Sequence, residues 1–135
     1  MSQNGTSQIV SKLWSYCNML RDEGLSYGQY VDQLTYLLFL KMAHERTQPP
    51  YSLPSVVPSP WDWEHLVAKE GDELEVHFRH TLEHLAKQPG MLGTIFRKAQ
   101  NHITNPSMLR RLVADLIGRE NWSAYSSDVK GYAYE

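Results

Sequence analysis

The chain has 135 residues, a formal net charge of −2 and a hydrophobic fraction of 41%, which is ordinary for one globular domain. The slight negative charge argues against a uniformly basic protein that wraps DNA, and the longest apolar run, 37–40, is far shorter than the ~20 residues of a membrane span. Cys17 is the only cysteine, so an intrachain disulfide is excluded and a reducing cytoplasm is compatible.

The first predicted helix runs from about Ser7 to Asp22, after residues 1–6, which we expect to have no fixed structure. Apolar residues recur along it at helical spacing. We expect this stripe to enter the core, with Trp14 and Cys17 among its buried residues; its members are Ile9, Leu13, Trp14, Cys17 and Leu20.

A well-marked joint follows. Gly24 can adopt the left-handed conformation that ends a helix, and Ser26 with Gln29 forms the pattern of a capping box. The second helix is therefore predicted from about 27 to 46. Its part from 34 to 43 is apolar on nearly every side, which is typical of a helix at the centre of a bundle.

Five prolines in residues 47–61 exclude a helix or central strand there. Further helices are predicted from about 61 to 69, between Asp72 and Pro89, and from 94 to 102. Asp72 with Glu75 resembles a capping box. Asn105 caps a last helix at 106–117, with Pro106 in its first position. The sequence thus predicts an all-α compact bundle of five to six helices with a proline-rich loop at about 47–61.

One family resemblance rests on the order of these residues. Residues 13–45 read LWxxCNxLRDxGLSYxxYVxQLTYLLFLKMxxE, and GTIFRKAQN at 93–101 and LRRLVADL at 109–116 extend the pattern. This resembles the N-terminal helical domain of the modification (M) subunit of type I restriction-modification systems, which are adenine-N6 DNA methyltransferases. The resemblance covers nearly the whole chain.

The resemblance implies a parent enzyme that uses S-adenosylmethionine and works on DNA with a specificity subunit, a restriction subunit and a second modification subunit. It implies that this domain carries no catalytic residue and helps to assemble the enzyme and close it around DNA. Residues 1–127 would form the domain. Residues 128–135 would start a linker to a catalytic methyltransferase domain, so we expect the chain to be a fragment.

Two motifs invite catalytic interpretations that the residues do not favour. His80 to His84 matches the HxxEH zinc pattern, but no third ligand follows, so a solvated helix surface is favoured over a metal site. Asn105 to Met108 begins like the NPP[FY] loop of amino-methyltransferases but lacks its second proline and its aromatic residue. No glycine-rich turn for S-adenosylmethionine is present either.

The charges are unevenly distributed. Residues 61–90 hold seven acids against three cations, whereas residues 91–119 hold five cations against one acid. We expect the basic part to point outward and to contact DNA or another subunit; the candidates are Arg97, Lys98, Asn101, Arg110 and Arg111. An ordinary solvated face, or ion pairs with the acidic segment, is the alternative. The alternative function is a stand-alone helical protein–protein adaptor with no nucleic-acid role.

Overall fold

A computed structural model describes residues 2–123, with side chains from Gln8 onward. In this range the chain forms six α-helices and no strand, and the last α-helix continues as a π-helix, η1. This confirms the prediction of an all-α bundle. The elements are α1 (Ser2–Asp22), α2 (Tyr27–Glu45), α3 (Trp63–Val67), α4 (Gly71–Ala86), α5 (Met91–Ile95), α6 (Pro106–Arg110) and η1 (Arg111–Leu116).

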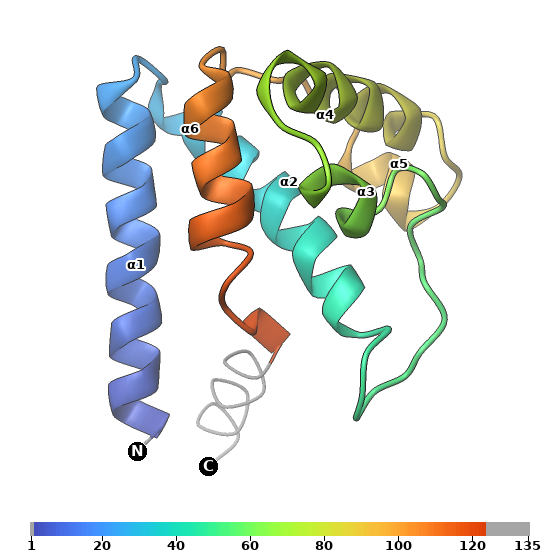
Figure 1. Cartoon of the computed structure of the whole chain (residues 1–135), viewed down its shortest axis with the longest axis horizontal. Coiled ribbons are helices and arrows are strands. Elements are labelled where there is room, and N and C mark those ends of the chain that lie inside the picture. The colour runs from blue at the N-terminus through green and yellow to red at the C-terminus, as the bar shows by residue number, and fades with distance from the viewer. Residues whose placement is uncertain (1, 124–135) are drawn as a thin grey trace.

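The long helices α1 and α2 are joined at a sharp angle. In Figure 1, α1 (blue) forms one edge, α6 and η1 (orange) are seen next to it in this view, and α2 runs diagonally behind α6 and past α3. The rings of Tyr16 and Trp122 meet edge to face with centroids 6.4 Å apart, and Lys12 pairs with Glu120. These contacts hold α1 against the chain that follows η1.

The joint between α1 and α2 has the predicted chemistry. Gly24 has a φ of 102°, and the Leu25 N–H donates to the Leu20 carbonyl at 3.1 Å, a bond typical of a left-handed helix end. The Gln29 N–H donates to the Ser26 hydroxyl at 3.4 Å, and the Ser26 N–H donates to the Gln29 side chain at 3.0 Å. The capping box is confirmed.

The helix α2 runs through the core, as its apolar sequence predicted. Leu34, Leu37 and Leu40 are at most 5% exposed, and each such burial stabilises the fold by about 2 kcal/mol. The Phe96 ring lies 5.4 Å from that of Tyr36, so the chain after α5 packs directly on α2.

Two polar residues of α2 are also buried, and both bind distant backbone. The carboxylate of Glu45 accepts from the N–H groups of Trp122, at 2.9 Å, and Ser123, at 2.8 Å, and lies 3.4 Å from the Lys41 ammonium. Gln33, fully buried, binds the backbone after α5. Buried polar groups require such partners because an unpaired one is costly.

Two predictions for α1 are wrong. Residues 2–6 belong to the helix; they contain no proline, so every residue there can take part in the helix. Trp14 is 61% exposed instead of buried. A helix at the edge of a bundle buries one stripe only, which Ile9, Tyr16 and Leu20 fill; Trp14 lies about 140° around the helix from Ile9.

The segment after α2 contains the predicted long loop, with cis peptide bonds at Pro50 and Pro60. The predicted helix at 61–69 is shorter, because Asp62 caps it and accepts from the His65 N–H at 3.2 Å. The capping box predicted at Asp72 is wrong. α4 begins one residue earlier, and no side chain caps it.

The predicted helix at 94–102 is also wrong. α5 begins at Met91 and ends at Ile95, and Lys98 has a φ of 60°, which a right-handed helix excludes. The first turn of α5 packs closely on the segment before it, since a Cβ at Gly93 would overlap the Gln88 carbonyl oxygen. The burial of Phe96 and Ile103 then turns the chain back toward α2.

The predicted linker at 128–135, and with it the predicted domain boundary, lies outside the described residues. Among residues 2–123, no helix combines the length and the hydropathy that a membrane crossing requires.

Candidate nucleic-acid interface

Three of the candidate contacts lie on the segment Phe96–Ile103, which we call the basic loop. Its ends are anchored, since Phe96 is fully buried and Ile103 is 1% exposed. Between them Arg97 and Lys98 are exposed, and neither forms an ion pair within residues 2–123. The basic loop therefore presents two adjacent, uncompensated cations to solvent.

Asn101 lies on the same loop but has an internal role. Its side-chain amide donates to the Ile103 carbonyl at 3.2 Å and to Glu75 at 3.4 Å, and its oxygen accepts from the Ile103 N–H at 2.9 Å. The side chain is half-buried and fully occupied. The expectation that Asn101 is an outward contact is not supported by this geometry.

Arg110 is also turned inward, so the expectation that it points outward is wrong. Its guanidinium donates to the carbonyls of Val67 at 2.6 Å and Lys69 at 2.8 Å. The last carbonyls of a helix lack intrahelical donors, and Arg110 supplies a donor to that of Val67, the last residue of α3. It is a structural link between α6 and the α3–α4 turn.

Arg111 is exposed but lies in mixed surroundings. It lines a surface hollow together with Glu70 and Asp115, and Asp115 also lies 3.8 Å from the Arg119 guanidinium. Carboxylates at this position weaken the field that a phosphate would meet. Of the five predicted contacts, Arg97 and Lys98 are thus the two that are exposed without a carboxylate beside them among the described residues.

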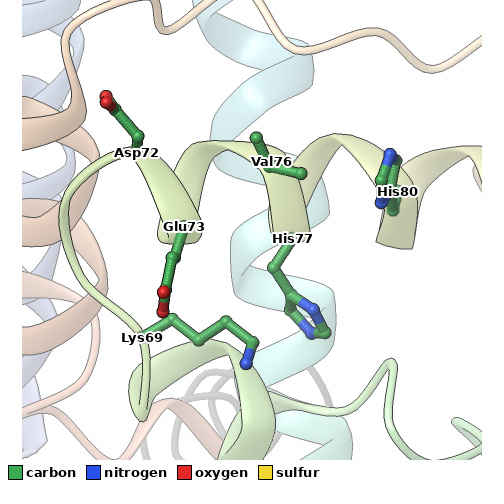
Figure 2. A pocket seen from close by; sticks show the side chains of 6 residues that line it. All are labelled: Lys69, Asp72, Glu73, Val76, His77 and His80. Carbon is green, nitrogen blue, oxygen red and sulfur yellow. The ribbon is translucent and has the colours of Figure 1, made fainter.

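The histidines of α4 form a different surface. Trp61 stacks on the rings of His77 and His84, with centroids 5.4 and 5.0 Å away. Burial lowers the pKa of His77, although its Nε2 bonds to the Pro60 carbonyl at 3.0 Å, and the positive charge of Lys69 lowers it further. Figure 2 shows Glu73 and His77 pointing from α4 toward the side chain of Lys69, and all three line one surface hollow.

The zinc interpretation gains no support. Within the described part of the chain, no group of three or more His, Cys, Asp or Glu side chains is arranged to hold a metal ion. Two of the histidines stack on a tryptophan instead, and His80 is exposed.

A nearby carboxylate has a cap role. Burial alone would raise the pKa of Asp62, but hydrogen bonds from His65 and Ser59 outweigh burial and lower it. Asn105 has the same role at α6, where its side-chain oxygen accepts from the N–H groups of Ser107 at 3.0 Å and Met108 at 3.3 Å. This is the helix cap that the sequence favoured over a methyltransferase loop.

The sequence did not single out Gln33 and Glu45, which hold distant backbone. The available signal was weak: each is a polar residue at the end of, or beside, an apolar run of α2. Such residues are as common on exposed faces, and only the fold shows what they bind.

Comparison with known proteins identifies the family. A model of the HsdM N-terminal domain matches residues 9–116. The chain belongs to the HsdM N-terminal domain family. The resemblance to type I modification subunits is thereby confirmed, and nothing in the comparisons supports a stand-alone adaptor.

Relatives of this HsdM N-terminal domain include two methylase subunits. The type I restriction enzyme StySPI methylase subunit of Salmonella potsdam and the EcoKI methylase subunit of Escherichia coli K12 are each 35% identical over 111 residues, or 82% of this chain. The chain spans 20% of the length of each.

A solved structure agrees. The crystal structure of the EcoKI M protein matches with a TM-score of 0.70 and 33% identity, over 84% of this chain and 23% of that one. The fold described above is therefore shared with a type I M protein.

Proposed function

We propose that this domain is the non-catalytic assembly and DNA-clamping part of a type I modification subunit. The complete enzyme would transfer a methyl group from S-adenosylmethionine to the N6 atom of adenine in DNA, in the cytoplasm. The family match and the methylase relatives support this proposal. The described residues contribute a rigid bundle and no recognisable catalytic group.

The domain would end near residue 127, and residues 128–135 would lead into the catalytic domain. Its partners would be DNA, a specificity subunit that reads the sequence, a restriction subunit and a second modification subunit. In that arrangement the bundle would reach DNA through its backbone phosphates, since sequence would be read by another subunit.

The observation that carries the DNA contact is the pair Arg97 and Lys98. Two adjacent cations stand exposed, with no ion-pair partner among the described residues, on a loop whose ends are buried. Arginine and lysine both bind phosphate oxygens, and most protein–DNA hydrogen bonds go to the backbone. Arg111 would add a weaker contribution because of its acidic neighbours.

The test is a salt titration of DNA binding by the complete methylase complex. In the Arg97→Ala/Lys98→Ala variant, affinity should fall about tenfold, and the slope of log K against log salt should flatten by about 1.8 per modification subunit. The matched control is Arg21→Ala/Arg119→Ala, which removes two exposed arginines elsewhere and should leave the slope near that of the wild type.

The outcomes distinguish a contact with DNA from a contact with another subunit. An unchanged slope in the Arg97→Ala/Lys98→Ala variant rejects the DNA contact. If the same variant also dissociates the complex at protein concentrations where the control stays intact, the two cations bind another subunit instead.

A further inference from the structure

The basic loop is held by a buried side chain of α2. The Gln33 amide nitrogen donates to the Gln100 carbonyl at 2.7 Å, and its oxygen accepts from the His102 N–H at 3.2 Å. Gln33 is fully buried. Both halves of one amide therefore bind the loop backbone, two residues apart, as a neighbouring strand would.

No other regular structure organises this backbone. The basic loop lies between α5 and α6 and belongs to no helix. Asn101, between the two residues that Gln33 holds, bonds to both the N–H and the carbonyl of Ile103. Two side-chain amides, one from α2 and one from the loop itself, thus bind the backbone of residues 100–103, in addition to the burial of Ile103.

Lys98 lies two residues before Gln100, the first residue that Gln33 binds. It has a φ of 60°, a left-handed backbone that a lysine adopts at an energetic cost. The Ala99 N–H donates to the Phe96 carbonyl at 2.9 Å and closes a turn around the two cations. Because Ala99 is buried and directly precedes Gln100, this turn is attached to the backbone that Gln33 holds.

We infer that Gln33 is a positioning residue for the DNA contact. It fixes the basic loop before DNA arrives, so that Arg97 and Lys98 meet two backbone phosphates without first being ordered. Ordering two long side chains and their loop on binding costs affinity, and Gln33 removes part of that cost in advance. This inference rests on the proposed DNA contact of Arg97 and Lys98.

A double-mutant cycle on the complete methylase complex tests it. In Gln33→Leu the charges remain, so DNA affinity should fall about fivefold while the salt slope stays near that of the wild type. In the Arg97→Ala/Lys98→Ala background, the same Gln33→Leu change should have almost no further effect on affinity. Such non-additivity is expected only if Gln33 acts through those two cations.

The outcomes separate this inference from the proposed function. If Arg97→Ala/Lys98→Ala leaves DNA binding unchanged, the DNA contact itself is rejected. If that variant binds weakly but Gln33→Leu binds like the wild type, or weakens binding equally in both backgrounds, the positioning role is rejected.

A second variant covers a failure of Gln33→Leu to fold. Asn101→Ala removes the other amide that shapes the loop, at a half-buried position where less packing is lost. The cycle run with Asn101→Ala should give the same non-additivity. Additive losses would overturn the inference.

Discussion

Two connections between helices are rigid in this domain for different reasons. The joint between α1 and α2 is held by bonds between residues at most five positions apart, such as Leu25 to Leu20 and Gln29 to Ser26. The basic loop is held by Gln33, which lies 67 and 69 positions from the residues it binds. A local connection forms from its own sequence, whereas a long-range one forms only with the whole bundle.

The largest loss of stability is expected at another long-range contact, in which Glu45 binds the backbone of residues 122–123. Glu45→Ala would remove the carboxylate that accepts from the N–H groups of Trp122 and Ser123 and that lies beside the Lys41 ammonium. The free energy of unfolding should fall by about 3 kcal/mol, measured by urea denaturation. Glu45→Gln, which keeps one acceptor oxygen, should lose clearly less; equal losses would mean that the carboxylate geometry is unimportant.

The basic loop should show the next largest effect. Gln33→Leu removes the partner of the Gln100 carbonyl and of the His102 N–H at a part-buried site, so the free energy of unfolding should fall by about 2 kcal/mol. Amide hydrogen exchange should speed up most at His102. A variant that exchanges like the wild type there would show that the loop is held by packing alone.

The joint should be less sensitive. Ser26→Ala removes one exposed cap bond, and the free energy of unfolding should fall by about 1 kcal/mol. Ser26→Asp keeps an acceptor for the Gln29 N–H and serves as the control, with stability near that of the wild type. A loss larger than that of Gln33→Leu would reverse the comparison between the two connections.

The difference between local and long-range bonds explains which parts of the fold the sequence could predict. Gly24, Ser26 and Gln29 carry their meaning in their spacing, so the joint and α2 were predicted correctly. The basic loop was predicted as helix because Ile95, Phe96 and Ala99 recur at helical spacing. Its turn at Lys98 depends on tertiary contacts that override this pattern.

The candidate site was only partly predictable for the same reason. The charges of residues 91–119 mark the basic segment, and Arg97 and Lys98 were placed outward correctly. Arg110 and Asn101 belong to the same run of residues, but their partners are Val67, Lys69 and Glu75, on α3, α4 and the turn between them. The sequence shows which side chains are polar. It does not show which of them form hydrogen bonds inside the folded domain and are therefore not available to a partner.

The smallest expected effect is a dependence of stability on pH, which comes from His77 on α4 and from neither of the two connections. The bonds of Gln33 and of Ser26 with Gln29 involve no group that titrates near neutrality, whereas the pKa of His77 is lowered, mainly by burial. The unfolded chain then binds its proton first, so stability is full above about pH 6.5 and falls as pH drops through the folded pKa of His77. His77→Gln should flatten this decline, measured by thermal unfolding at several pH values; a decline as steep as in the wild type would assign it to other groups.

The central claim is that the basic loop faces DNA, and site-specific photocrosslinking tests it most directly. A benzoylphenylalanine placed at Lys98 in the complete methylase complex with bound duplex DNA should crosslink to DNA. The same group at Trp14, exposed on the outer face of α1, serves as the comparison and should crosslink to DNA far less. Crosslinks from position 98 to another subunit, and none to DNA, would contradict the account.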